Sequence, residues 1–463
     1  MKRLVAFIIV TATIVAAQSH YEAAASVESK GGHSVNGKSM IDDVSDIYNF
    51  PSEVSSAMNA AQGTVVYDPT EPPVNFMNGS AFVAKSITNS ISAGFVFVSN
   101  STVINDKTGF ATLLGNGTIP GVISVMNTAL GGYNFTNVEE PTNASHFLLG
   151  LKLASDMHLG LDVFREASNM DYSNTDVQLD NTGQKRTEIT ERFVNYGAIG
   201  LNAGLEMKLS NIELKGVAGF TNLGFEANNN ESGTDYDGSK LDNETNIIKA
   251  ESGIYIPVSG KASLKIANAH KLTLGLDFFY TIASFSGEFT RITGSTTVST
   301  KLKSGDVSTM GMAAGILDEM QVGENTIVYA SVVVGKNSTT STPPDSVTST
   351  TPETYVASIL FPKTSVGVEH RIKKLWKFDE LIVRAGGFKN YYWSNSTETG
   401  SNGSIMEESD FPTSDPFVWT TGIGFVMGKV TLDLTIRPDH WNGVYLISGK
   451  GPYAGTVTMT YDY

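Results

Sequence analysis

Apolar and polar residues alternate along most of the chain after residue 61, with the period of two that a β-strand imposes on its two faces. Between 271 and 282, for example, Leu272, Leu274 and Leu276 share one face and Asp277 lies on the other. About sixteen such segments can be identified. They lie near 62–68, 76–86, 90–98, 145–154, 157–166, 187–208, 211–224, 248–266, 271–287, 306–320, 325–336, 353–372, 380–394, 416–427, 430–437 and 453–463.

The connections between these segments alternate in length. Short turns are expected at 155–156 and 428–429, whereas long polar loops are expected at 167–186, 225–247 and 288–305. Short turns at one end and long loops at the other are typical of a transmembrane barrel. A soluble β-sandwich also alternates its faces, but it has no reason to place a long loop at every second connection. The pattern predicts an all-β fold, a closed antiparallel transmembrane β-barrel of about 14–16 strands.

Charged residues share the face opposite the apolar one in the late strands. They are Glu369, Arg371, Arg384, Asp433 and Arg437. A charge facing lipid is costly, whereas a charge facing the interior of a barrel is tolerated. We therefore expect these five side chains to line the lumen, and the apolar face to point outward.

The last residues of the chain form one more alternating segment. Val457, Met459, Tyr461 and Tyr463 alternate with threonines and Asp462, and the chain ends on an aromatic residue. This pattern resembles the C-terminal signature that bacterial barrels present to the barrel-assembly machinery, with Tyr461 and Tyr463 as its aromatic positions. We expect this strand to pair with the first one and so to close the barrel.

The N-terminus has the features of a secretory signal peptide over 1–17. Lys2 and Arg3 precede an apolar run, 4–16, which small residues follow. The alternative is a membrane anchor, but the run is shorter than the ~20 residues that a spanning helix needs. An exported barrel is expected in the outer membrane of a Gram-negative bacterium, with outer-membrane lipid around it.

Composition excludes several functions. The 463 residues include no cysteine and carry a formal net charge of −15. Nucleic-acid binding needs a basic surface, and a disulfide framework or a thiolate metal site needs cysteine. We therefore expect no nucleic-acid partner.

No pattern of catalytic or metal-binding residues stands out. The histidines are scattered, and the adjacent Ser145 and His146 should point to opposite faces of a strand. The acidic stretch 42–46 lacks the spacing of an EF-hand, which favours a solvated or salt-bridged turn. We expect no enzyme activity, no metal and no cofactor.

Residues 42–52 resemble the N-terminal hatch of the FadL-like family of outer-membrane transporters of hydrophobic compounds. That hatch shows two acidic residues, a small polar stretch, an aromatic residue and then Asn-Pro-Ala. Here Pro51 takes the proline position, and Phe50 stands where the family has asparagine. The segments 364–371, 381–387, 422–425 and 430–433 are similar to late strands of the same family and its relatives.

The resemblance implies a monomeric barrel whose N-terminal segment, 18–61, forms a plug inside the barrel strands of 62–463. The alternative for 18–61 is a disordered terminus, but its apolar residues favour the plug. Its aspartates would then pair with lumen arginines. The residues expected in the plug are Asp42, Asp43, Asp46, Tyr48, Phe50 and Pro51.

The same resemblance implies passive transport of hydrophobic small molecules through the plugged lumen. Two other functions remain open from the sequence. One is a general porin, whose pore would be open and filled with water. The other is a structural or assembly component of the outer membrane, whose lumen would hold no ligand.

Overall fold

The structure of the chain is a computed structural model. It describes residues 30, 33–35, 38–42, 46–47, 49–55, 59–67, 76–99, 143–179, 182–241, 243–267, 269–293, 296–341, 354–399, 405–409, 413–414, 417–436 and 456–462. The predicted signal peptide and several predicted loops lie outside these residues. No helix among the described residues is long and apolar enough to cross a membrane.

The described strands form one closed antiparallel barrel of sixteen strands, which confirms the predicted fold class. The strands are β3 (Ala60–Tyr67), β4 (Phe76–Ser86), β5 (Ile91–Ser99), β6 (Asn143–Ala154), β7 (Met157–Leu179), β8 (Lys185–Leu209), β9 (Ile212–Thr234), β10 (Asn243–Ala267), β11 (His270–Thr293), β12 (Thr296–Val322), β13 (Thr326–Ser341), β14 (Thr354–Lys373), β15 (Glu380–Thr399), β18 (Val418–Met427), β19 (Val430–Ile436) and β20 (Thr456–Asp462). The short strands β16 (Ile405–Ser409) and β17 (Thr413–Ser414) pair with β15. Strand β20 pairs with β3 and closes the ring, as predicted.

The two faces of the barrel wall differ as the alternation predicts. Leu274 and Leu276 of β11 are 50% and 64% exposed, whereas Thr273 and Asp277, which flank them in sequence, are buried. The same contrast recurs around the wall, where large apolar side chains are exposed and polar ones are buried. Because the exposed side chains are apolar, the outer surface is suited to lipid.

Several predicted loops are wrong, because strands continue through them. Strands β7 and β8 pair from Met157↔Met207 to Leu179↔Lys185 and leave only a short hairpin turn near 182. The predicted loops 225–247 and 288–305 are likewise mostly strand. Backbone pairing holds these extensions, in which polar side chains outnumber apolar ones and no regular apolar face is continued. At about 3.3 Å per residue, the 25 residues of β8 extend well beyond an apolar belt of about 25 Å.

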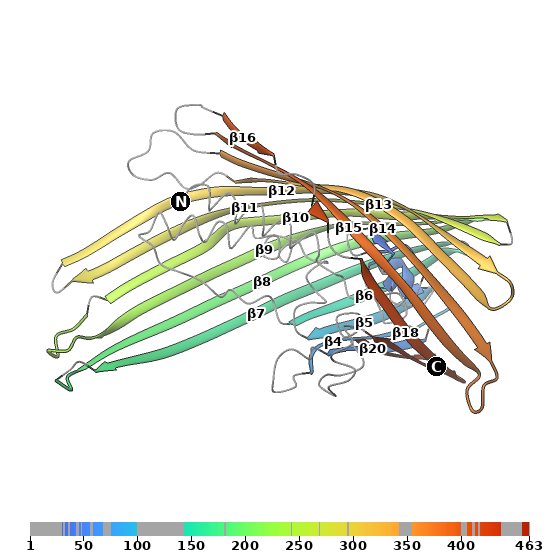
Figure 1. Cartoon of the computed structure of the whole chain (residues 1–463), viewed down its shortest axis with the longest axis horizontal. Helices are drawn as coiled ribbons and strands as arrows, with labels where there is room; N and C mark the ends of the chain where they lie inside the picture. The colour runs from blue at the N-terminus through green and yellow to red at the C-terminus, as the bar shows by residue number, and fades with distance from the viewer. Residues whose placement is uncertain are drawn as a thin grey trace.

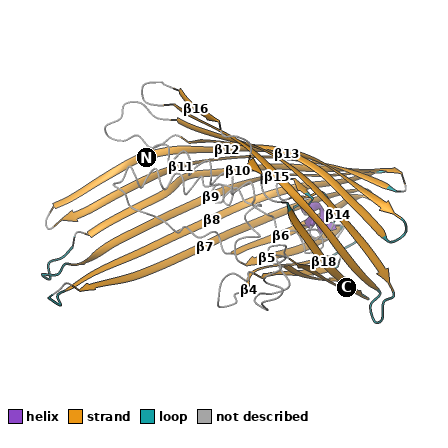
Figure 2. Cartoon of the chain, in the orientation of Figure 1, coloured by secondary structure: helices purple, strands orange, loops and turns teal. Residues whose placement is uncertain are grey.

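The described residues of the N-terminal segment, here residues 30–55, add no strand to the wall. Its two-residue strands β1 (Ser34–Val35) and β2 (Lys38–Ser39) pair only with each other. A short 3₁₀ helix, η2 (Pro51–Ser55), follows. The segment lies within the ring of strands, toward the end where the short turns gather (Figures 1 and 2).

Candidate functional site

Glycines on the inner face of the wall make room for the N-terminal segment. At Gly160 an added Cβ atom would lie 2.1 Å from the carbonyl carbon of Pro51. At Gly367 it would collide with the backbone carbonyl of Lys30. We call the glycines that contact the segment in this way the glycine floor: Gly94, Gly150, Gly160, Gly204, Gly275, Gly315 and Gly367. Each lies a few residues from a short turn, so the segment forms one layer across that end of the barrel.

Apolar side chains of the segment are buried against two parts of the wall. Ile47 and Val54 pack with side chains of β3 to β6, among them Phe82. Val35 and Met40 pack with side chains of β12, β13 and β15. The segment therefore spans the lumen, since it contacts the wall on both sides. Burying an apolar side chain of this size stabilises by about 1.5–3 kcal/mol.

Two aspartates of the segment bind three lysines of the wall. The carboxylate of Asp42 accepts from Lys215 at 3.0 Å and from Lys261 at 2.8 Å, and it also contacts Lys271. The carboxylate of Asp46 lies 2.5 Å from Lys261 and 3.8 Å from Lys215. These five residues are the aspartate–lysine cluster. Lys215 and Lys261 are buried, so without the segment or water in its place their charges would be unpaired, at considerable cost.

The two aspartates differ in how their surroundings shift their pKa. Burial alone would raise the pKa of Asp42, but the ammonium groups of Lys261, Lys215 and Lys271 together hold it far below its ordinary value. Burial raises the pKa of Asp46 to about 7, and the two neighbouring lysines only partly offset that effect. Asp42 is therefore the stronger anion of the cluster.

The predicted pairing of these aspartates with lumen arginines is wrong for the described residues. Arg384 is buried on the inner face, where it donates to Glu369 at 2.9 Å and to Asp433 at 2.5 Å. Arg371 also binds Glu369, at 2.8 Å. The wall thus neutralises its own arginines, and the lysines remain for the aspartates.

The start of the N-terminal segment also contacts Glu369, the carboxylate that binds Arg384 and Arg371. The ammonium group of Lys30 lies 3.0 Å from Glu369. Nearby, the Nδ1 atom of His33 lies 2.6 Å from the Ser331 hydroxyl. Burial, together with the charge of Lys363, lowers the pKa of His33 to about 3, so this imidazole is neutral. The segment is consequently held by polar contacts with the wall at two places, around Lys30 and His33 and around Asp42 and Asp46.

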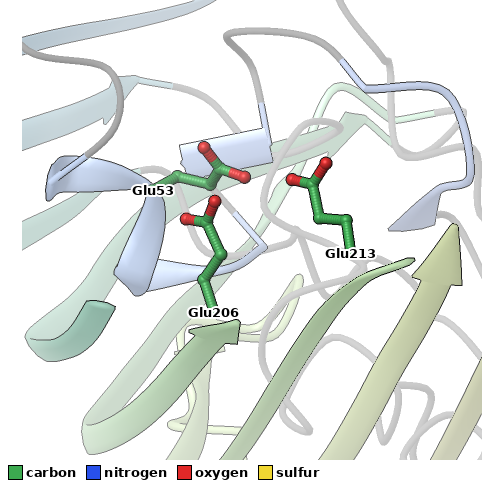
Figure 3. Close-up of side chains that lie close together, drawn as sticks. All are labelled: Glu53, Glu206 and Glu213. Carbon is green, nitrogen blue, oxygen red and sulfur yellow. The ribbon is translucent and has the colours of Figure 1, made fainter. Parts of the chain in front are cut away.

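Three glutamates meet beside η2 (Figure 3). The carboxylates of Glu53, Glu206 and Glu213 offer oxygens that all lie within 4.8 Å of one another, close enough to hold a cation. Lysines already lie there: Lys215 contacts Glu53 and lies 3.1 Å from Glu213, and Lys208 lies 2.9 Å from Glu206. The trio is accordingly an ion-pair cluster that extends the aspartate–lysine cluster, with Glu53 as a third anion of the segment.

The other residues singled out from the sequence divide into two groups. Asp43, Tyr48, Arg437 and Tyr463 lie outside the described residues. The remaining ones are placed. Phe50 is buried with its ring 5.5 Å from the Lys261 ammonium, Pro51 begins η2 on the glycine floor, and Tyr461 is exposed on the outer face of β20.

Ser145 and His146 lie on opposite faces of β6, as predicted. His146 is buried, and its Nδ1 atom lies 3.1 Å from both carboxylate oxygens of Asp162. Asn202 donates to the same carboxylate, and Phe164 stacks on the imidazole. The histidine thus belongs to a packed polar group of the wall, and Ser145 has no access to it.

The lysines and the glycine floor were missed in the sequence, although both carry a signal. Lys215 and Lys261 occur at inward positions of their strands, where the alternation otherwise gives small or polar residues. Gly150, Gly160 and Gly204 recur at inward positions a few residues from a short turn. Such a row of inward glycines beside lysines indicates that a separate acidic segment lies against the wall.

We expect the Asp42→Asn variant to conduct ions severalfold better than the unchanged chain near neutral pH, because it removes the anion that contacts three lysines. The stabilisation that the Asp42 charge provides is complete above its ordinary pKa of 3.8 and is lost as the pH falls below that value. The conductance ratio of variant to unchanged chain in planar bilayers should therefore shrink between pH ~4 and pH ~2. Asp156→Asn, at an exposed turn, is the control. A ratio that stays constant with pH would contradict the assignment.

Comparison with known proteins finds solved structures that are similar only at low sequence identity and low TM-score. No protein-family model and no curated protein sequence matches the chain. Among solved structures, a FadL homologue from Pseudomonas aeruginosa is 12% identical, covering 92% of this chain and 96% of its own, with a TM-score of 0.40. The toluene transporter TodX from Pseudomonas putida is 11% identical (95% and 98% covered, TM-score 0.38), and the monoaromatic hydrocarbon channel CymD is 9% identical (91% and 93% covered, TM-score 0.37).

These values are too low to assign a function from the neighbours. What the chain's own residues define is a closed antiparallel β-barrel with an apolar outer face, whose N-terminal segment contacts the inner face from both sides of the lumen.

Proposed function

We propose that this chain is an outer-membrane β-barrel through which hydrophobic small molecules pass by diffusion, and that residues 30–55 act as a plug that blocks water and ions. The apolar outer face supports a place in a membrane, since a closed barrel satisfies its backbone hydrogen bonds without water. The signal peptide expected from 1–17 and the C-terminal pattern support the outer membrane of a Gram-negative bacterium.

The observation that carries the plug is the fit between the N-terminal segment and the wall. Glycines lie where the segment comes closest to the wall, against its backbone at Gly160 and Gly367, and lysines lie where its carboxylates are. A buried lysine such as Lys261 is costly unless an anion pairs with it. If the N-terminal segment had no role in the lumen, nothing would favour placing such lysines there. An open water-filled pore would not require the glycine floor.

The hydrophobic nature of the solute rests on the resemblance of residues 42–52 to the FadL-like hatch. A plug that stops ions would still let an apolar solute cross, because such a solute needs no continuous path of water. It could leave after a small local displacement of the plug. The polar solutes that a general porin passes would be stopped. The two functions therefore differ in which solutes cross.

Uptake measurements separate the two. Cells that carry the chain in their outer membrane should take up labelled toluene faster than cells with an empty vector. Proteoliposomes containing the intact chain should not swell in isotonic sugar. Toluene uptake equal to that of the vector control would reject hydrophobic transport, and rapid swelling in sugar would establish the porin instead.

A further inference from the structure

The turn between β14 and β15, residues 374–379, displays an unusual side chain. Trp376 is 83% exposed, more than any other large apolar residue in the described part of the chain, and Leu375 beside it is 43% exposed. The Trp376 ring meets Phe378 edge-on, and Phe378 lies against Phe425 of β18, with ring centroids 4.9 Å apart. Phe425 alternates with the buried Gly424 and so faces outward. The aromatic side chains of the turn therefore continue the outer apolar face.

The backbone of the turn is conformationally strained where it exposes Trp376. Lys374 and Trp376 have φ values of 55° and 58°, two of the four positive values at non-glycine residues in the described chain. A bulky side chain rarely adopts this conformation, which costs on the order of one kcal/mol or more. Hydrogen bonds fix it: the Lys374 amide donates to the Asp379 carbonyl at 2.8 Å, and the Phe378 amide donates to the Leu375 carbonyl at 3.0 Å. Strain that the fold maintains in this way is often found at functional sites.

The turn is also basic in a chain whose net charge is −15. Lys373, Lys374 and Lys377 are all exposed, and no carboxylate of the described residues forms an ion pair with them. Asp379, within the turn, accepts instead from the backbone amide of Gly428 at 2.6 Å, and Glu380, the strand partner of Lys373, lies 3.6 Å from Arg371. The ammonium group of Lys377 lies 5.6 Å from the Trp376 ring. Three lysines that form no ion pair with the described residues thus lie within three positions of an exposed indole.

We propose that residues 373–379 form a binding site for the head groups of anionic phospholipids in the membrane leaflet at the short-turn end. Trp376 lies at the boundary between head groups and acyl chains, where indole rings are enriched. The lysines bind the phosphates, since basic residues beside a membrane attract anionic lipids. The site rests on the proposed place of the barrel in a membrane, but it does not depend on the plug or on transport.

Quenching of Trp376 fluorescence by brominated lipids tests the site in the full-length protein. Bilayers of phosphatidylcholine receive the same mole fraction of brominated phosphatidylglycerol or brominated phosphatidylcholine. The difference between the unchanged chain and Trp376→Phe isolates the signal of Trp376. We expect stronger quenching by the anionic lipid, with an enrichment on the order of fivefold per lysine at low salt that fades at high salt.

Two triple variants distinguish this turn from general surface charge. Replacing Lys373, Lys374 and Lys377 by Gln should make the two lipids quench equally. Replacing Lys85, Lys152 and Lys429 by Gln, which are exposed near other short turns, should leave the preference unchanged. Equal quenching in the unchanged chain, or a preference that survives the first triple variant, would overturn the proposal.

Trp419, 63% exposed on the outer face, separates failure of this site from failure of the proposed function. If lipid quenches Trp419 and not Trp376, the barrel is in the membrane and the lipid site alone is rejected; a protein partner for the turn would then be the alternative. If lipid quenches neither, both proposals are rejected. Ion conduction by the intact chain would reject the plug and leave a measured lipid preference standing.

Discussion

A chain lacking residues 30–55 should conduct ions through planar bilayers about tenfold better, or more, than the intact chain, because barrels of this size leave an aqueous channel when nothing occupies the lumen. The wall should survive the deletion, since β3 to β20 pair only among themselves and β1 and β2 pair only with each other. Water entering the lumen would solvate Lys215, Lys261 and Lys271. Single-channel recordings measure the effect, and the heat-dependent gel mobility typical of folded barrels checks that the wall has formed.

Adding the missing part back is the matched control. A synthetic peptide with the sequence of residues 30–55 should reduce the conductance of the shortened chain, whereas a scrambled peptide of equal composition should not. High conductance of the intact chain, unchanged by the deletion, would show that the segment does not close the lumen. The lumen would then be a porin channel.

The sequence predicts the wall well because its apolar outer face and its polar inner face require a strict alternation of side chains. Each of the sixteen predicted segments overlaps an observed strand. The extensions of the long strands were missed because polar residues occur on both of their faces. Asn228, Asn229 and Asn230 pair in β9 through their backbone, and their side chains give no sign of it.

The lumen was harder to predict than the wall. The sequence identified Asp42 and Asp46 as anions of the plug and led us to expect lumen arginines such as Arg384 as their partners, not Lys261. Only the structure shows that Asp433 and Glu369 bind Arg384. Whether two charged side chains form an ion pair in a barrel depends on their positions along the barrel axis. Alternation within one strand says which face a residue lies on, but not where it lies along that axis.

Replacing Gly160 by Ala should release the N-terminal segment and leave the wall intact. A Cβ atom at this position would lie 2.1–2.2 Å from backbone atoms of Pro51 and Ser52, which cannot rotate away as a side chain can. Overpacking of this kind costs about 1–3 kcal/mol or more, and each ~1.4 kcal/mol changes the ratio of open to closed molecules tenfold. We therefore expect conductance to rise by about tenfold, approaching that of the deletion.

Labelling provides an independent measurement of the same release. The chain has no cysteine, so Val54→Cys introduces a single thiol. Val54 belongs to the N-terminal segment, and its side chain is fully buried between the segment and the wall. A maleimide should modify this thiol slowly in the parent and about tenfold faster with Gly160→Ala, in proportion to the open population. Gly197→Ala is the matched control, because a Cβ atom there meets nothing within 4 Å. If Gly160→Ala labels and conducts like Gly197→Ala, the contact between η2 and β7 does not hold the segment in the lumen, and the plug must be attributed to the aspartate–lysine cluster alone.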